Sequence, residues 1–179
     1  MELGEKGEIG MKRFLLGLIC GIGMAVLVGA LLMPQVGRLF FVEDRSLLPF
    51  DETVEQIREH CQQNPHWHIT QEKDYNAAYA KRGKGELPFR LTEFKLGNPD
   101  HSYRINKEYP AVCTFMPAAI AVVEYKPEDV RIYRKNTGFM GRMFTGSVKE
   151  VMQYEVPREL DQILSGIIEK NTPAKNENE

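Results

Sequence analysis

The sequence has little of what marks several common functional classes. It has only three cysteines in 179 residues, too few for a disulfide framework. Its formal net charge is −2 with no basic stripe, which argues against a nucleic-acid-binding surface. It contains no GxSxG, HExxH, P-loop or dinucleotide-binding motif, and no serine has a recognisable base partner. We therefore expect no catalytic residues, no cofactor and no nucleic acid partner.

A long apolar run is the clearest feature that is present. Residues Phe14 to Met33 contain no charge, Asn, Gln or Pro. A helix of that length spans about 30 Å, the thickness of a bilayer's hydrocarbon core. Because Lys12 and Arg13 precede the run, the positive-inside rule places the N-terminus in the cytoplasm. The sequence thus predicts a single-pass anchor in the cytoplasmic (inner) membrane, with the following domain outside, in the periplasm.

A cleaved signal peptide is the alternative. Val28-Gly29-Ala30 fits the small-residue rule for a cleavage site. The apolar run continues through Leu31 and Leu32, however, and exceeds the usual length of about 7–15 residues for a signal-peptide core. We favour a retained signal-anchor.

Small residues recur every four positions along this run. A helix would gather them on one face, where another helix can approach closely. The alternative is that glycine is simply frequent in membrane helices. This spacing predicts a helix–helix contact, with a membrane-protein partner or a second copy of the chain, at Gly17, Gly21, Ala25 and Gly29.

The rest of the chain reads as one α+β domain. Residues 1–13 are expected to be cytoplasmic, 14–33 transmembrane, 34–45 a juxtamembrane connector, 46–170 the domain and 171–179 a flexible tail. Periodicity predicts a helix from about residue 51, with Asp51 as N-cap, and strands at 67–70, 88–96, 118–124 and 130–134. The apolar strand 118–124 is expected to be central and buried on both faces. The mixed order predicts a small, mostly antiparallel sheet packed by helices.

Several motifs together resemble the DUF302 family. They are Ser46 with the segment 50–54 (FDETV), Gly97-Asn98-Pro99, Phe115-Met116-Pro117 and the segment 136–144 (NTGFMGRMF). Their order and spacing match the family over residues 46–168. The resemblance implies a compact α+β fold and little about activity, because the family is one of unknown function; it also includes membrane-anchored members. Some members carry cysteines at the positions of Gly97 and Ala118, so a thiol site is not carried over to this chain.

A ligand or partner contact is the main candidate site. The stretch from Gly138 to Phe144 places Met and Phe beside flexible glycines, which suits an adaptable apolar surface, although the same residues could pack a helix onto the sheet. A pocket beside them would favour a small molecule. The expected contact residues are Asn98, Pro99, Met116, Pro117, Asn136, Phe139 and Met140.

Two polar motifs have structural explanations as well as chemical ones. His66 and His68 are weak candidates for zinc or copper, but alternation around Trp67 also leaves them facing water, so no metal is predicted. Asp100 and its neighbours could hold an anion at a helix N-terminus, but Asp100 as an ordinary N-cap is favoured.

The sequence leads to two functional hypotheses. The first is a membrane-anchored accessory or binding protein for a membrane-associated partner. The alternative is a domain that binds a small molecule or a metal, with weak enzymatic activity at most.

Overall fold

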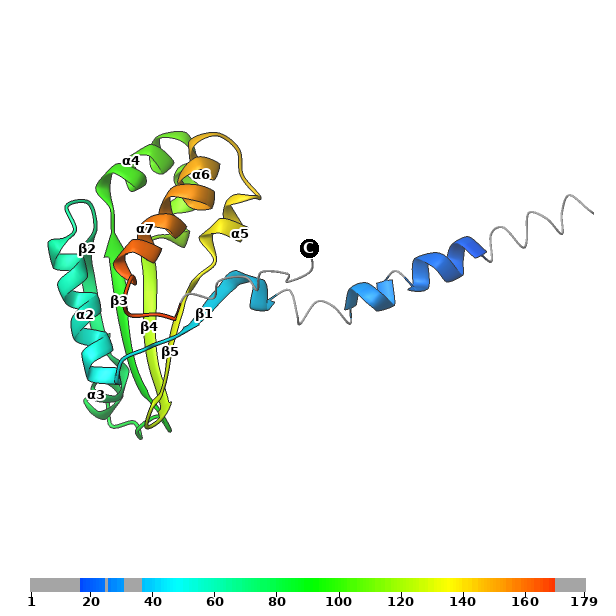
Figure 1. The fold of residues 1–179 in the computed structure, drawn as a ribbon. Coiled ribbons are helices and arrows are strands. Elements are labelled where there is room, and N and C mark those ends of the chain that lie inside the picture. The colour runs from blue at the N-terminus through cyan, green and yellow to red at the C-terminus, as the bar shows by residue number, and fades with distance from the viewer. Residues whose placement is uncertain (1–16, 25, 31–36, 170–179) are drawn as a thin grey trace, which may run out of the picture. The chain divides into compact units, whose positions relative to one another are not determined.

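The computed structural model describes residues 17–24, 26–30 and 37–169. The chain divides into two compact units, residues 1–39 and 40–179, which are described separately (Figure 1).

The first unit contains the predicted membrane segment. Residues 17–24 and 26–30 are helical and exposed, and a side-chain carbon added at Gly17, Gly21 or Gly29 would meet no atom within 4 Å. Within the described residues, no helix is both long enough and apolar enough to cross a membrane. The remaining parts of the expected span (residues 14–16, Ala25 and 31–33), the segment 1–13 and the tail 171–179 lie outside the described residues. A short 3-10 turn, η1 (Gly37–Phe40), leads into the second unit.

The second unit is built on a five-stranded sheet in the order β1-β5-β4-β3-β2, in which every pairing is antiparallel. The strands are β1 (Phe41–Arg45), β2 (His68–Asp74), β3 (Arg90–Gly97), β4 (Ala118–Lys126) and β5 (Asp129–Lys135). β1 lies within the segment expected to be a connector and pairs along β5, with Phe41 opposite Lys135.

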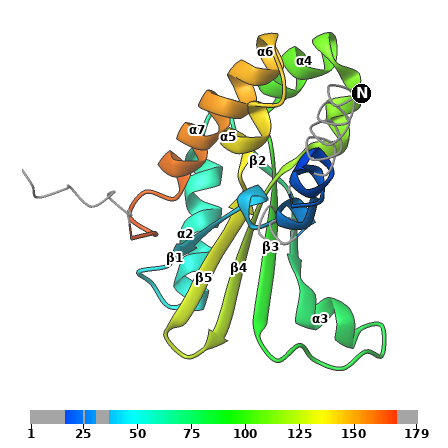
Figure 2. The same cartoon turned by 90° about the vertical axis from the view of Figure 1, so that its right-hand side faces the viewer.

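Helices cover one face and one end of this sheet. In Figures 1 and 2, α2 and α7 lie against one face, α4, α5 and α6 gather at one end, and α3 lies at the other. The α+β prediction is therefore confirmed. The helical elements are α2 (Phe50–Gln63), α3 (Tyr75–Ala80), α4 (Pro99–Glu108), the 3-10 helix η2 (Pro110–Phe115), α5 (Thr137–Gly141), α6 (Gly146–Glu150), the π-helix η3 (Val151–Glu155) and α7 (Val156–Ile163).

Strand alternation explains the core. Phe94, Ile120 and Ile132 share one face of the sheet by their register and are fully buried in the core. β4 lies between β3 and β5 as expected, but its burial on both faces holds only in part: on the uncovered face Val123 is buried, whereas Ala119 and Ala121 stay partly exposed.

The predicted cap of the first long helix is also wrong. α2 begins at Phe50 with Pro49 at the cap position and no side-chain cap. Asp51 lies in the first turn and binds Arg90 instead, with Oδ1 2.5 Å from Nη2. The hydroxyl of Thr53 bonds back to the Pro49 carbonyl, which secures the start of the helix.

A π-turn and a glycine shape the C-terminal helices. Pro157 has no N–H for the helical ladder, and the π-helix η3 immediately precedes the α7 turn that contains it. α5 packs directly on this π-turn. A Cβ added to Gly141 would lie 2.6 Å from the backbone nitrogen of Gln153, so only glycine allows this approach.

We predict that Gly141→Ala lowers the free energy of unfolding by about 1–3 kcal/mol, because the backbone it would strike cannot move aside cheaply. Gly138→Ala is the matched control. It lies in the same short helix, its added carbon would meet nothing closer than 3.6 Å, and it should be neutral or stabilise by up to about 1 kcal/mol. Chemical denaturation of both variants gives the comparison; equal stabilities would contradict the packing argument.

Candidate functional site

A cavity of about 440 Å³ lies at the end of the sheet where β3 and β5 finish and β2 and β4 begin. Residues of α4, η2 and the C-terminal helices complete its wall. Small-molecule sites have volumes of about 300–1,000 Å³ and mainly apolar walls with a few polar groups. The cavity fits that description. Its apolar wall includes Leu96, Ile105, Val112, Met116, Met152 and Val156.

The turn from β3 into α4 sets one side of the cavity. Asn98 is buried and is the N-cap of α4, with Oδ1 accepting from the backbone N–H groups of Asp100 (3.1 Å) and His101 (3.2 Å). Pro99 occupies the first helical turn, where its missing N–H has no cost. The expectation that Asp100 is the cap is therefore wrong, and its side chain is exposed. The cap positions His101 at the cavity wall.

His101 lies between two carboxylates. Its side chain is only 10% exposed, and its Nε2 is 2.8 Å from Glu159 Oε2. Its Nδ1 is buried, has no hydrogen bond within the described part of the chain, and lies 3.5 Å from Glu155 Oε2. The indole of Trp67, which also lines the cavity, donates to Glu159 Oε2 at 2.7 Å. One carboxylate oxygen thus faces both an indole and an imidazole.

Arg104 neutralises the second carboxylate. It binds Glu155 as a fork, with Nη1 2.8 Å from Oε2 and Nη2 3.0 Å from Oε1. These hydrogen bonds lower the pKa of Glu155 below its usual range and raise the pKa of Arg104. Glu155 therefore carries its charge at neutral pH, next to His101.

The same cluster contains groups that bind metals in other proteins. In the described part of the chain, His101, Glu155 and Glu159 form the one group of three that could hold an ion. The two nitrogens of His101 face different carboxylates, and Arg104 occupies both oxygens of Glu155. Apart from His101 Nδ1, the donors and acceptors are thus committed to one another, and the arrangement suits a charged hydrogen-bond network rather than a metal.

A lysine provides the positive charge of the cavity. Lys135, the last residue of β5, lines the wall and donates from Nζ to the carbonyls of Phe115 (2.7 Å) and Pro117 (3.1 Å). Burial lowers its pKa. No carboxylate among the described residues lies within 4.0 Å of Nζ. An ammonium has three donors, so one remains for a ligand.

The cysteines differ in access. Cys113 is exposed and lines the cavity, whereas Cys61 is buried in the core. Burial raises the pKa of the Cys61 thiol to about 11, which keeps it protonated and unreactive.

The residues expected at a contact site separate into two groups. Asn98, Pro99, Met116 and Pro117 line the cavity. The other three do not, although their neighbour Thr137 does. Asn136 caps α5 by accepting from the Phe139 N–H at 3.0 Å, Phe139 stacks edge-on against Phe40, and Met140 is buried in the core.

The two histidines proposed as weak metal ligands differ in whether they line the cavity. His68 lines the cavity, and His66 is exposed with its Nδ1 4.0 Å from Asp100 Oδ2. Sequence reasoning missed the roles of Lys135, Cys113, Glu155 and Glu159. The spacing of the two glutamates, four residues apart on one helical segment, was the available signal for a shared face.

Comparison with known proteins agrees with this fold. A family model described as "Domain of unknown function DUF302" matches residues 42–167. The chain belongs to the DUF302 family. A crystal structure described as an uncharacterised conserved DUF302 protein from Bacillus stearothermophilus is similar, with a TM-score of 0.59 and 17% identity. The match covers 70% of this chain and 95% of that one, and at this identity it shows the fold alone. Among curated proteins, none matches.

Two small residues belong to the cavity wall. Gly97 and Ala118, the positions at which the family resemblance led us to carry over no thiol site, both line the cavity. A Cβ on Gly97 would lie 2.9 Å from Nε2 of His68, so the glycine leaves room for the imidazole beside the strand. Small residues at both positions leave volume in the cavity.

We predict that Glu159→Ala destabilises the domain by about 1–3 kcal/mol, because it leaves the Trp67 and His101 donors unpaired. Trp67 is the single tryptophan, so its emission should also shift. Glu159→Gln keeps an oxygen acceptor and should lose less. Glu150→Ala is the control, since its side chain is 63% exposed and its ion pair within the described residues is with Arg104, and it should cost at most about 1 kcal/mol. An equal loss for Glu150→Ala and Glu159→Ala would contradict the assignment.

The lowered pKa of Glu155 predicts a pH dependence. A depressed folded-state pKa stabilises the fold above the ordinary glutamate value of about 4.3, and this contribution is lost as the pH falls through the lower folded value. Arg104→Gln removes the cause. The stability difference between the wild type and this variant should therefore shrink as urea denaturation is repeated from pH 6 to pH 3. A difference that stays constant over this range would show that Arg104 acts by packing alone.

Proposed function

We propose that the DUF302 domain binds an amphipathic small molecule with an apolar body and an anionic head, and that the N-terminal apolar segment anchors the chain in the cytoplasmic membrane with the domain in the periplasm. The cavity supports the binding role, because a largely apolar wall is combined with one lysine that forms no ion pair within 4.0 Å among the described residues.

The wall favours an apolar body. Met116, Pro117 and Ala118 are partly exposed wall residues that a ligand's hydrocarbon would contact, and removing such surface from water contributes about 25 cal/mol per Å². The thioethers of Met116 and Met152 adapt to irregular shapes, which suits a chain-like ligand.

The charges favour one orientation of that ligand. Lys135 belongs to β5 and His68 to β2, and the two strands are separated by β4 and β3. Three strand spacings correspond to about 14 Å. Because Lys135 is the cavity's lysine, an anionic head lies at its side of the cavity and accepts a charge-assisted hydrogen bond there. Among the described residues, the side of the cavity at Trp67 holds no lysine or arginine in its wall, so that side is left for the apolar body.

The anchor rests on the apolar run and on the basic pair before it. An accessory role toward a membrane-associated partner is a second proposal that depends on the same segment and on its small-residue spacing.

The binding proposal predicts that 8-bromooctanoate quenches Trp67 fluorescence in a saturable manner, because Trp67 lines the cavity and bromine quenches indole on contact. The probe is soluble and can be added to the full chain in unlabelled phosphatidylcholine vesicles. Lys135→Met should weaken its binding about tenfold, which corresponds to about 1.4 kcal/mol. Lys149→Met, an exposed lysine on α6 outside the cavity, should leave it unchanged.

An 8-bromooctylamine titration tests the sign of the charge. The amine should bind more weakly than the carboxylate, and the Lys135→Met change should reduce that difference. Equal binding of both probes, or the absence of saturable quenching, would contradict the proposed function.

A further inference from the structure

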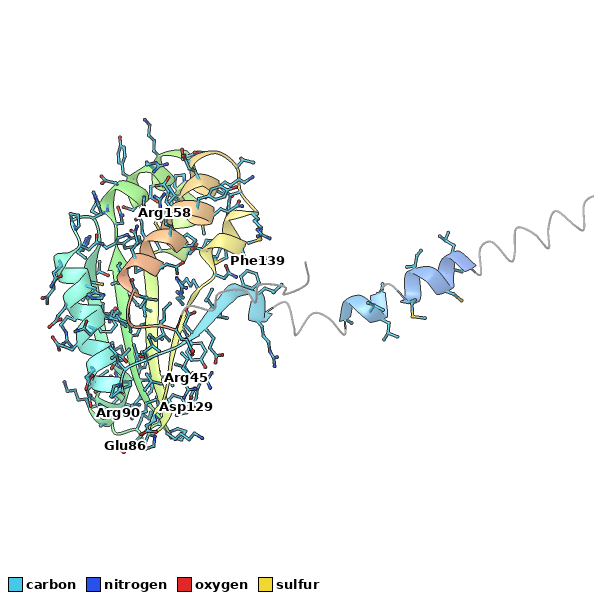
Figure 3. All side chains as sticks on the ribbon, in the orientation of Figure 1. Arg45, Glu86, Arg90, Asp129, Phe139 and Arg158 are labelled. Carbon is cyan, nitrogen blue, oxygen red and sulfur yellow. The ribbon has the colours of Figure 1, made fainter. Side chains whose placement is uncertain are left out.

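The chain enters the globular unit beside the cavity. The backbone N–H of Asn136 donates to the carbonyl of Phe40 at 2.7 Å, and Phe41 pairs with Lys135. Lys135 is the cavity's lysine, and Thr137, two residues further on, also lines the wall. In Figure 3, Phe139 lies beside the start of β1, whereas Glu86 and Arg90 lie at the opposite end of the domain.

Exposed aromatic side chains stand at the same end. Phe41 is 61% exposed and Phe115 is 46% exposed. We call these two residues the aromatic rim. Lys135 joins them, because it pairs with Phe41 in the sheet and its Nζ binds the Phe115 carbonyl. Large aromatic groups exposed to solvent beside a cation suit the interface of a membrane, where rings enter the acyl boundary and ammonium groups remain at the head groups.

The length of the connection limits where this rim can lie. Residues 34–39 separate the apolar run from Phe40, and six extended residues span at most about 22 Å. If the apolar run is inserted in a bilayer, the cavity end therefore stays close to its surface, whereas the hairpin between β4 and β5 lies at the other end of the strands.

We infer that the ligand is a single-chain carboxylate amphiphile taken directly from the bilayer, with the aromatic rim docked on the membrane surface. This inference rests on the proposed function and adds the source and class of the ligand. The acyl chain enters between the two rim residues, its carboxylate stops at Lys135, and its hydrocarbon passes along the apolar wall toward Trp67.

The test uses the full chain reconstituted in phosphatidylcholine vesicles that contain 9,10-dibromostearate. Trp67 should be quenched as the brominated chain fills the cavity, and excess unlabelled octanoate should reverse the quenching. Phe41→Ser should slow or weaken this uptake about fivefold and leave the affinity for 8-bromooctanoate unchanged, because Phe41 does not line the cavity. Leu47→Ser is the matched control: Leu47 is 59% exposed, follows the other end of β1, and should behave as the wild type.

The outcomes separate the two proposals. Failure of 8-bromooctanoate to bind overturns the proposed function together with this inference. Octanoate binding without reversible quenching by dibromostearate overturns the membrane source and leaves the function intact. Uptake by Phe41→Ser equal to that of the wild type overturns docking through the rim.

Discussion

The ion-paired network around Glu159 and Glu155 holds the cavity in shape. Glu159 is 21% exposed at its side chain, and a carboxylate so far removed from water must be compensated by donors. Trp67 precedes β2, His101 belongs to α4, and both donate toward Glu159 on α7. Three segments are thereby fixed to one oxygen atom. Since the cavity lies among these segments, its volume depends on this charge remaining paired.

A second constraint acts through the backbone. Pro157 cannot continue a regular hydrogen-bond ladder, and η3 widens the helix directly before α7. The widened turn is where α5 approaches, and Gly141 allows its backbone to come within contact of Gln153. This packing keeps α5 close to the end of β5, so Thr137 and Lys135 reach the same cavity as residues of α4. The site thus depends on backbone fit as well as on charge.

Membership of the DUF302 family explains the scaffold and leaves its ligand open. The similar Bacillus stearothermophilus structure shares the fold at 17% identity, which carries no information about individual wall residues. The properties that favour an anionic amphiphile come from this chain itself: an apolar wall and a lysine whose ammonium group donates to two carbonyls. The small residues Gly97 and Ala118 contribute by leaving space.

The sequence by itself determined what depends on neighbours along the chain. Alternation around Phe94 and Ile132 predicted strands, the mixed order of elements predicted α+β, and short motifs predicted the family. It also selected Asn98 and Met116, which line the cavity. Helix caps were harder to predict, because Asp51 and Asp100 are residue types typical of an N-cap, but the backbone places Pro49 and Asn98 at those positions. The edge strand β1 was also hard to predict, because it is short and its alternation (FVEDR) is weak.

Only the tertiary structure decided the rest of the site. His101 and Glu159 are 58 positions apart, and Trp67 and Glu159 are 92 apart. Lys135 ends a strand that looks ordinary in the sequence, and its role appears once the Phe115 and Pro117 carbonyls lie beside it. The spacing of residues along one helix or strand reflects the stability of that element alone. Contacts between distant residues depend on strand register and helix packing over the whole domain, so no short window of sequence predicts them.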